Sequence, residues 1–307
     1  MNASLRAAVI GAGSIGAQLD EVGTPEPLTH AGGYKATGFD LVAIADSAEA
    51  ARERAKCWEC AVCADLDEAM RCKPDIVSLA VPTEQRAGLL ERALAYRPRA
   101  VIAEKPLALS SAEGERIIRL YRDAGVPLIV NYTRRFVPAW QRLRGRDAMT
   151  ATIRYAKGVR HNGTHAIDLC RMLFGECTQY QPLASKYDHW RDDPTVSAFL
   201  GFERCPEVFL QALDERCFTL FEVDIVYQTA RIVVDSDGRR LRPFQLREGA
   251  GIPPGRRLVE TAAQETGAAS AMINLMRHAR DVIDGAEPLC TGEDAVAAQK
   301  IAERLSA

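Results

Sequence analysis

Short apolar runs alternate with amphipathic stretches over roughly the first 130 residues of the chain. The runs are rich in β-branched and small aliphatic residues, as buried parallel strands are. The stretches between them keep helical spacing, as Leu89, Leu90, Ala93 and Leu94 do. The predicted strands are 7–10, 41–45, 61–63, 75–80, 100–103 and 127–131, and the predicted helices are 48–58, 65–70, 84–96 and 110–125. Repeated βα units of this length predict a doubly wound parallel sheet. Residues 21–38, with two prolines and a Gly-Gly pair, are predicted as a long connection.

The pattern changes after residue 136, where strands dominate. Phe221, Val223, Ile225 and Tyr227 alternate with polar residues, which is typical of an antiparallel sheet with one covered face. The predicted strands are 151–155, 197–202, 207–213, 218–227 and 229–235, with a turn at Gly238 and a loop at 249–255. Helices are predicted at 138–145, 269–283 and 294–305. The fold class is therefore α/β, with a parallel N-terminal sheet followed by an α+β domain whose open sheet is mostly antiparallel.

Composition and charge narrow the possible functions. The chain has 307 residues, is 47% hydrophobic and carries a net charge of −2, so no basic surplus indicates nucleic-acid binding. No apolar run approaches the about 20 residues of a membrane span. The start of the chain leads directly into a strand and leaves no room for a signal peptide, so we expect a cytoplasmic protein.

Nine cysteines are expected to be reduced thiols in that compartment. Cys57, Cys60 and Cys63 form a C-x-x-C-x-x-C run, which raises metal or iron–sulfur ligation as an alternative. The run crosses a predicted helix end and a predicted strand instead of lying in a cluster loop, and no Cys-Pro follows it. We therefore predict no metal site and assign these cysteines to packing.

The first apolar strand is followed at once by Gly11-Ala12-Gly13-Ser14-Ile15-Gly16. A G-x-G-x-x-G motif between a strand and a helix is typical of dinucleotide binding. Gly11 permits the tight turn, Gly13 lets a pyrophosphate approach the backbone, and Gly16 allows close helix–sheet packing. At the helix start, Ser14 and Ile15 belong to the stretch whose free N–H groups face the phosphates.

Asp46 ends the second predicted strand. A carboxylate at this point accepts both ribose hydroxyls of an adenosine and repels a 2′-phosphate, which favours NAD over NADP. The connection at 21–38 accounts for the long gap between the glycines and Asp46. Asp46 is also suited to cap the helix predicted at 48–58.

The strand at 100–103 ends on Glu104, Lys105 and Pro106. Ligands of open α/β sheets bind outside the carboxyl ends of the strands, so we predict that Lys105 projects into that crevice. Taken alone, Lys105 is better explained as a solvated residue at a strand end, and the motifs before and after it favour the site.

In the second half, His161, His165 and Asp168 have the spacing of one helix face. Such a group can supply acid/base chemistry, because the unperturbed pKa of histidine lies near neutrality. Metal binding and a polar, exposed helix start are the alternatives.

These motifs together resemble the Gfo/Idh/MocA family of NAD(P)-dependent oxidoreductases over essentially the whole chain. The resemblance is carried by the glycine motif, Asp46 and four further segments, namely Val81-Pro82-Thr83, Glu104-Lys105-Pro106, residues 131–136 and residues 163–169. It implies a Rossmann domain at 1–131, a substrate-binding and oligomerisation α+β domain at 132–288, and a C-terminal helix at 289–307 that packs back on the Rossmann domain. It also implies hydride transfer at a carbinol carbon of a sugar or cyclitol.

The resemblance further implies roles for single residues. Lys105 would hydrogen-bond the reacting hydroxyl, His165 would act as acid/base, and Asp168 would hold the substrate or the imidazole. The catalytic residues expected are thus Lys105, His165, His161 and Asp168. Besides the glycine motif and Asp46, the cofactor contacts expected are Pro82, Thr83, Glu104 and Lys105, and the substrate contacts expected are Lys105, Asn131, Arg135, Arg160 and His165.

Two positions depart from the family pattern. His161 stands where many members have an aspartate, four residues before the histidine, and Gln85 stands where a histidine is frequent. The proton route of the family therefore does not carry over unchanged.

The function predicted is an NAD(P)-dependent sugar dehydrogenase or ketoreductase, with NAD as the cofactor and a homodimer or homotetramer as the assembly. A phosphorylated or nucleotide-linked sugar of a polysaccharide or unusual-sugar pathway fits the basic residues near the two motifs. NAD-dependent glycoside hydrolysis on the same fold and a non-catalytic, NAD-binding regulatory protein are the alternatives. We expect no nucleic-acid partner and no membrane partner.

Overall fold

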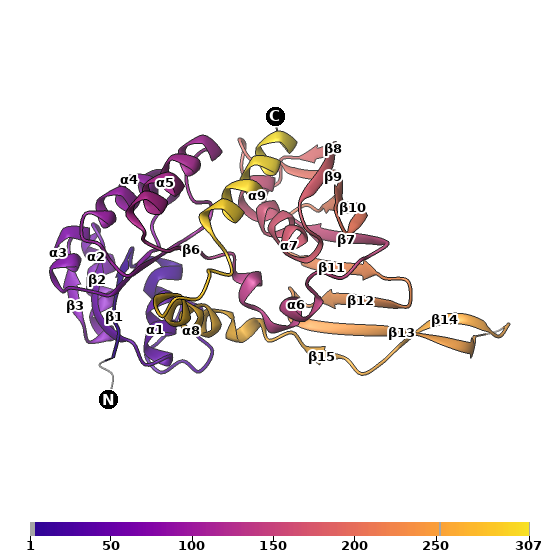
Figure 1. The fold of residues 1–307 in the computed structure, drawn as a ribbon, viewed down its shortest axis with the longest axis horizontal. Coiled ribbons are helices and arrows are strands. Elements are labelled where there is room, and N and C mark those ends of the chain that lie inside the picture. The colour runs from indigo at the N-terminus through magenta and orange to yellow at the C-terminus, as the bar shows by residue number, and fades with distance from the viewer. Residues whose placement is uncertain (1–3, 252, 307) are drawn as a thin grey trace. The chain divides into compact units, whose positions relative to one another are not determined.

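A computed structural model describes residues 4–251 and 253–306. The chain divides into two compact units, the first made of Met1–Phe136 with Ala269–Ala297 and the second of Val137–Ala268 with Ala298–Ala307. Each unit contains one sheet (Figure 1). Among the helices of the described residues, none has the length and apolar character needed to cross a bilayer.

The first unit is built on a six-stranded parallel sheet in the order β3-β2-β1-β4-β5-β6. The strands are β1 (Arg6–Ile10), β2 (Asp40–Ala45), β3 (Ala61–Cys63), β4 (Ile76–Leu79), β5 (Ala100–Ala103) and β6 (Leu128–Val130). Every residue of β4 and β5 is buried, as the continuous apolar runs predict. The strand order reverses between β1 and β4, so the carboxyl ends of these two strands frame the crevice where ligands of this topology bind. The predicted doubly wound sheet is confirmed.

The helices of the first unit begin and end at residues with recognisable capping chemistry. They are η1 (Ser14–Gln18), α1 (His30–Ala36), α2 (Glu49–Ala55), η2 (Lys56–Trp58), α3 (Leu66–Arg71), α4 (Thr83–Leu94), α5 (Ser111–Ala124), η3 (Thr133–Phe136) and α8 (Ala271–Ile283). The Asp65 carboxylate accepts from Glu68 N at 2.9 Å, and Ser110 Oγ accepts from Glu113 N at 3.2 Å. Gly125 ends α5 in the left-handed conformation.

The long connection predicted at 21–38 contains a helix that was not predicted, α1. Thr29 caps α1 by accepting from Gly32 N at 3.0 Å. The Gly-Gly pair that suggested a loop serves close packing instead. A Cβ on Gly33 would lie 2.8 Å from Met272 Cγ of α8, so only glycine lets the two helices approach this closely.

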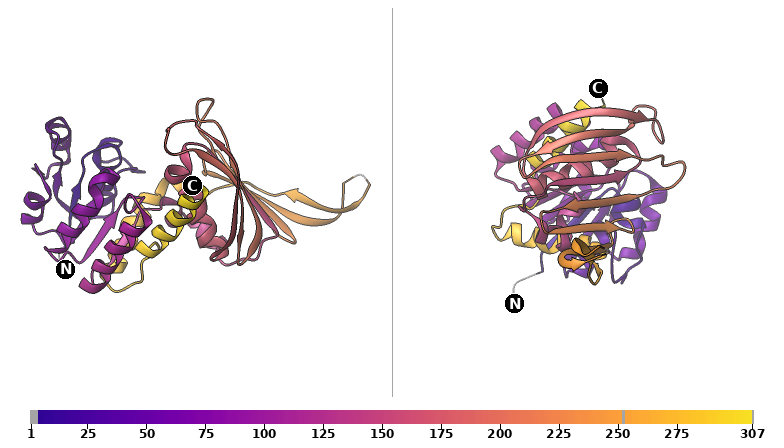
Figure 2. Two further views of the ribbon diagram at one scale, coloured as in Figure 1. Left: turned by 90° about the horizontal axis from the view of Figure 1, so that it is seen from above. Right: turned by 90° about the vertical axis from the view of Figure 1, so that its right-hand side faces the viewer.

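The second unit contains a sheet in the order β14-β13-β12-β11-β7-β10-β9-β8, with β15 paired to β13. Its strands are β7 (Thr150–Tyr155), β8 (Cys177–Lys186), β9 (Thr195–Phe202), β10 (Cys205–Ala212), β11 (Phe221–Val226), β12 (Ala230–Asp235), β13 (Arg240–Ala250), β14 (Gly255–Glu260) and β15 (Gln264–Glu265). Only β7 and β10 pair in parallel, so the prediction of an open, mostly antiparallel sheet is confirmed (Figure 2).

One face of this sheet is covered by helical segments, as the alternation predicts. Phe221, Val223 and Ile225 of β11 are buried while the residues between them are not. The helical segments of the unit are α6 (Pro138–Leu143), η4 (Gly158–Gly163) and α7 (Thr164–Phe174), together with the end of α9 (Gly292–Leu305). The short η5 (Ala268–Ser270) lies at the boundary, with only Ala268 in this unit. Both η4 and α7 pack on β9.

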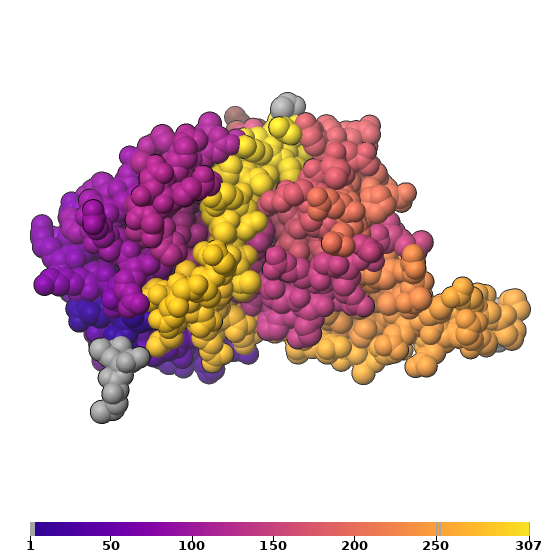
Figure 3. Space-filling view, viewed as in Figure 1, coloured from indigo at the N-terminus to yellow at the C-terminus, as the bar shows by residue number. Residues whose placement is uncertain are grey.

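Several elements of the second unit differ from expectation. Strands β8, β13, β14 and β15 were not predicted, and the strand expected at 218–227 begins only at Phe221. The loop expected at 249–255 is the turn between β13 and β14, whose hairpin extends beyond the rest of its sheet (Figure 3). The domain boundaries expected at 131/132 and 288/289 also differ from the observed division, because α8 belongs to the first unit and α9 contributes residues to both.

Candidate active site

The glycine motif forms the tight turn that its residues predict. Gly11 has a φ of +98°, and a Cβ there would lie 2.4 Å from the Ala80 carbonyl oxygen, which excludes any other residue. Gly16 packs as closely, since a Cβ would lie 1.9 Å from the Gly11 carbonyl oxygen. Nothing lies within 4 Å of the Cβ position of Gly13, so the backbone at Gly13 is open to a pyrophosphate. Ser14 is exposed and Ile15 half-buried at the start of η1.

A cavity of about 410 Å³ opens beside this turn, at the carboxyl ends of β1, β2 and β4. Its lining includes Gly11, Gly13, Asp46 and Pro82, four of the residues predicted to contact the cofactor. Gln85, one of the two departures from the family pattern, lines the same cavity. Thr83, predicted as a contact, begins α4 beside Pro82 but is not part of the lining. The open backbone and the adjoining cavity fit the adenosine and pyrophosphate of a dinucleotide.

Asp46 has a structural part that the sequence did not reveal. Its carboxylate accepts from Ala12 N at 2.8 Å and from Ala48 N at 2.9 Å, so it ties the glycine turn to the start of α2. The residue that caps α2 is Ala48, so the expected capping by Asp46 is indirect. A carboxylate has about four acceptor positions, so these two bonds leave capacity for ribose hydroxyls.

Lys105 follows the buried strand β5 at the carboxyl edge of the sheet and is half-buried. The strand pairing continues one residue past β5, because Glu104 N donates to the Leu79 carbonyl at 3.2 Å. On the other side, the buried Arg86 of α4 donates from its guanidinium to the Pro106 carbonyl, and also to the Val81 carbonyl at 2.5 Å. Backbone contacts therefore fix the chain immediately before and after Lys105.

The neighbouring carboxylate of Glu104 lies inside the first unit. Its Oε1 accepts from His30 Nε2 at 3.0 Å and from Asn131 Nδ2 at 2.7 Å. Burial raises the pKa of Glu104, but the hydrogen bonds from His30 and from the Asn131 amide more than offset it and hold that pKa below its usual value. The predicted contacts of Glu104 with cofactor and of Asn131 with substrate stay predictions.

Arg135, predicted to contact the substrate, is almost fully buried in the first unit. Its guanidinium donates to the Leu289 carbonyl at 2.9 Å and pairs with Asp294 at 3.1 Å. These bonds join the segment after β6 to the start of α9. The geometry gives Arg135 a structural part and lends no support to the substrate contact.

In the second unit, the two histidines and the aspartate lie on η4 and the first turns of α7, at three depths. His161 is exposed and its ring packs on Trp190, with ring centroids 4.4 Å apart. His165 is half-buried, and Asp168 is fully buried. His161 and His165 thus remain accessible, whereas Asp168 belongs to the interior of the unit. Their predicted catalytic parts stay predictions.

The loop between β8 and β9 holds the segment that carries these histidines. The Asp193 carboxylate accepts from Arg160 N at 2.8 Å and from His161 N at 2.9 Å. Thr195 Oγ1 accepts from Gly158 N at 2.7 Å. The predicted substrate residue Arg160 is exposed, and its Nε donates to Ser306 Oγ at 2.9 Å. Nothing local in the sequence indicates this loop, since its partners lie about 30 residues away.

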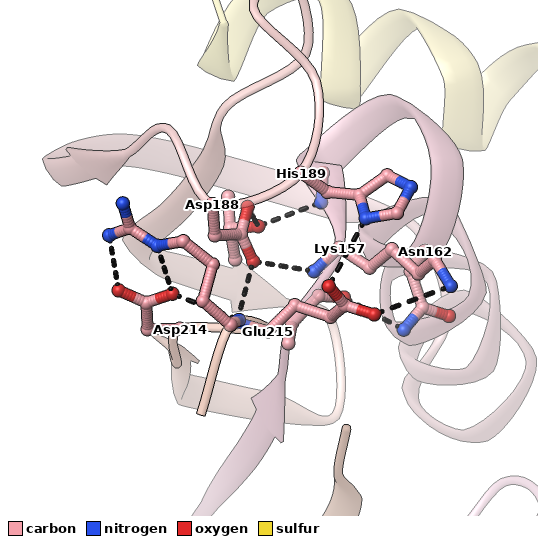
Figure 4. Close-up of polar contacts among 10 residues, drawn as sticks. Lys157, Asn162, Asp188, His189, Asp214 and Glu215 are labelled. Atoms are coloured by element: carbon pink, nitrogen blue, oxygen red, sulfur yellow. Dashed lines mark hydrogen bonds and ion pairs between the residues drawn. The ribbon is translucent and has the colours of Figure 1, made fainter. Parts of the chain in front are cut away.

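A charged cluster that the sequence did not predict lies beside the same loop (Figure 4). Glu215 pairs with His189 Nδ1 at 3.1 Å and with Lys157 Nζ at 3.6 Å. The Asp188 carboxylate organises the backbone beneath them, accepting from Lys157 N at 3.0 Å and Glu215 N at 3.2 Å. The cluster therefore unites three loops of the second unit through side chains.

We expect Asp193→Ala to destabilise the second unit by about 2 kcal/mol, because two backbone N–H groups lose a charged acceptor in a buried place. Urea unfolding followed by fluorescence measures this loss. The exposed neighbour provides the control, since Asp192→Ala should change stability by less than about 0.5 kcal/mol. Equal effects of the two substitutions would contradict the anchoring part of Asp193.

The three cysteines of the run differ in burial, with Cys57 exposed, Cys60 half-buried and Cys63 buried. Burial raises the pKa of Cys60 and that of Cys63 to about 11, so both are protonated at neutral pH, whereas a metal ligand must be a thiolate. Within residues 4–251 and 253–306, no group of three or more His, Cys, Asp or Glu side chains is arranged to hold a metal ion.

Known proteins match both the sequence and the fold. A family model described as an oxidoreductase family with an NAD-binding Rossmann fold matches residues 5–132. Residues 5–132 belong to the Gfo/Idh/MocA oxidoreductases. The resemblance stated from the motifs is thereby confirmed, as is an NAD-binding Rossmann domain. The chain is also 25% identical over 253 residues to a D-apiose dehydrogenase of Paraburkholderia graminis, covering 72% of this chain and 67% of that protein.

Solved structures extend the likeness over the whole chain. A UDP-N-acetylglucosamine 3-dehydrogenase from Acidithiobacillus ferrooxidans aligns with a TM-score of 0.76 and 20% identity, covering 99% of this chain and 97% of that one. An oxidoreductase from Agrobacterium radiobacter, solved with NAD⁺, L-tartaric acid and magnesium, aligns with a TM-score of 0.75 and 16% identity, covering 98% and 95%. At these identities the two structures show that both units share the fold of Gfo/Idh/MocA oxidoreductases.

Proposed function

We propose that the protein is an NAD-dependent dehydrogenase or reductase that transfers hydride between nicotinamide and a carbinol or keto carbon of a sugar or sugar derivative. The observation that carries the proposal is the place of Lys105. It follows a buried central strand at the same sheet edge as the glycine turn and the cavity of a dinucleotide-binding domain. D-apiose and UDP-N-acetylglucosamine dehydrogenases among the similar proteins support a sugar as the substrate class.

The chain supplies the proton chemistry of this reaction, and NAD, when bound, supplies the hydride acceptor. Oxidation of a carbinol develops negative charge on its oxygen. The Lys105 ammonium is suited to stabilise that charge through a hydrogen bond of roughly 3 Å. His165, half-buried and accessible, is suited to receive the proton. His161 packs on Trp190 and lies four residues earlier, so its part is to shape the entrance to His165, without the fixed negative charge common in the family.

The direct test is NADH formation on a panel of free, phosphorylated and nucleotide-linked sugars, followed by absorbance. We expect turnover with at least one class. Release of an aglycone without net NADH would indicate glycoside hydrolysis instead. Tight NAD binding with no turnover on any class would indicate a regulatory protein.

Asp46 favours NAD over NADP, which gives a separate prediction. Replacement by the neutral Asp46→Asn should lower the preference for NAD by about tenfold, since it removes the charge that repels a 2′-phosphate and weakens the ribose hydrogen bonds. The ratio of the two dissociation constants from calorimetry is the appropriate measure, because any loosening of the glycine turn affects both cofactors equally. An unchanged ratio would contradict this part for Asp46.

A homo-oligomer working in the cytoplasm fits the remaining features. The uncovered face of the second sheet carries Phe199 and Phe209, whose rings lie 5.4 Å apart, and Phe209 is 41% exposed. Leu183 of β8 is also exposed, and apolar faces of this kind support self-association. All nine cysteines are free thiols, as suits a reducing compartment.

A further inference from the structure

A row of buried polar side chains runs through the first unit and ends at the residue before Lys105. Tyr34 OH lies 2.7 Å from Ser78 Oγ, and Ser78 Oγ lies 2.9 Å from His30 Nδ1. His30 Nε2 lies 3.0 Å from Glu104 Oε1, which also accepts from Asn131 Nδ2 at 2.7 Å. Tyr34, Ser78 and His30 are each 0% exposed. Three separate segments, α1, β4 and the end of β5, are joined in this way.

The row has one direction of donation. Burial raises the pKa of the Tyr34 phenol far above its usual value, so Tyr34 stays protonated and donates to Ser78. The hydroxyl of Ser78 then donates to His30 Nδ1, which must be the unprotonated ring nitrogen. The proton of the imidazole lies on Nε2 and is donated to Glu104. With this arrangement and Glu104 ionised, every group in the row has its partner.

The row cannot carry protons to solvent, because its far end at Tyr34 is closed within the core. The effect of the row is to hold Glu104 as a carboxylate in a fixed position. Three side chains act on this carboxylate, namely His30 of α1, Asn131 after β6 and Arg86 of α4. All of the charge among them is cationic, so the surroundings favour the ionised form of Glu104.

The anchoring of Glu104 restricts the backbone from which Lys105 extends. Strand β5 ends at Ala103, and Glu104 is held both by its backbone and by its buried carboxylate. The Glu104 N–H is bonded to the Leu79 carbonyl, and the Pro106 carbonyl is bonded by Arg86. Lys105 therefore lies between two segments that buried side chains hold.

We propose that His30 is a positioning residue for hydride transfer, which through the hydrogen bond from its Nε2 holds Glu104 as a carboxylate and so fixes Lys105 at the sheet edge. The proposal rests on the function proposed above, because it assigns a role in hydride transfer to the contact between His30 and Glu104, which are 74 positions apart in the sequence. Tyr34 and Ser78 act indirectly, because their hydrogen bonds determine which ring nitrogen of His30 carries the proton donated to Glu104.

The test compares His30→Leu, which removes the donor, with His30→Gln, whose amide N–H can replace it. We expect His30→Leu to lower kcat by about 100-fold, because a small displacement of a reacting group has that effect, while the KM for NAD changes little. Without the His30 donor, burial raises the pKa of Glu104, so the acid limb of the pH profile of kcat moves to higher pH. His30→Gln should restore most of kcat and the position of the limb.

A measurement that needs no turnover separates this proposal from the sugar-dehydrogenase assignment. Acylation of Lys105 by acetic anhydride, followed by mass spectrometry across pH, reports the protonation and exposure of its amine. We expect Lys105 to be acylated at lower pH in His30→Leu than in the wild type, and in the isosteric Glu104→Gln as well, which keeps the side-chain volume. The proposal would be overturned if Glu104→Gln or His30→Leu protein, still folded and binding NAD, gave the same acylation curve for Lys105 as the wild type. This outcome can be read even if the sugar substrate is unknown.

Discussion

Lys105→Met lowers kcat by about 10²–10³ and leaves the dissociation constant of NAD within about twofold of the wild type. This is the result we expect for an ammonium that stabilises charge only as the substrate oxygen becomes negative. Methionine keeps the length and apolar stem of the side chain, so the loss reports the charge and its hydrogen bond. Steady-state kinetics with the best sugar and calorimetric titration of NAD measure the two quantities.

A lysine on the surface of the same unit supplies the control. The Lys56 ammonium pairs with Glu53 on α2, and its side chain is 63% exposed, so Lys56→Met should leave both quantities unchanged. Parallel losses of kcat and NAD affinity in Lys105→Met would assign Lys105 to cofactor binding instead of the chemical step. Retained kcat would remove it from the mechanism.

Gly11→Ala should abolish tight NAD binding and lower the free energy of unfolding of the first unit by about 3 kcal/mol. Two effects add at this position. The φ of +98° is strained for any other residue, and a Cβ would approach the Ala80 carbonyl oxygen to 2.4 Å. Because the obstacle is backbone of a central loop, the turn that faces the pyrophosphate must shift. Urea unfolding and calorimetric titration of NAD measure the two losses.

Gly23→Ala isolates the first effect, the conformational strain. Gly23 has a similar φ of +90°, but nothing lies within 4 Å of its Cβ position. We expect this control to cost only the conformational strain, about 1 kcal/mol, with NAD affinity unchanged. Equal effects at Gly11 and Gly23 would contradict the view that close backbone approach makes Gly11 necessary.

The parts of the site that could be predicted from the sequence are those set by local pattern. Buried parallel strands appear as continuous apolar runs, and their ends are marked by Gly11, Asp46 and Lys105 themselves. Since the ends of parallel strands share one sheet edge, these residues could be brought together without knowing any long-range contact. The strands and helices of the first unit could be predicted for the same reason, because their patterns are local.

The parts that could not be predicted depend on contacts between distant segments. Gly32 and Gly33 indicate a loop by their local preference, yet Gly33 lies in α1 because α8 packs against it. Nearly all of β8 and β14 is exposed, so neither strand shows the alternation by which strands are recognised. The anchoring of the histidine segment by Asp193 and of Glu104 by His30 joins residues more than 30 positions apart.

The most direct test of hydride transfer is isotopic. The test uses a sugar that supports NADH formation and carries deuterium at its carbinol carbon. We expect the NADH formed to carry this deuterium on its nicotinamide ring, with one label transferred for each ketone formed. Mass spectrometry of the recovered cofactor measures the transfer. The function proposed here predicts stoichiometric deuterium in the cofactor from the wild type and, at equal time and enzyme concentration, about 10²–10³-fold less labelled cofactor from Lys105→Met. Release of the deuterium to water, or formation of a product that has not been oxidised, would contradict hydride transfer to NAD.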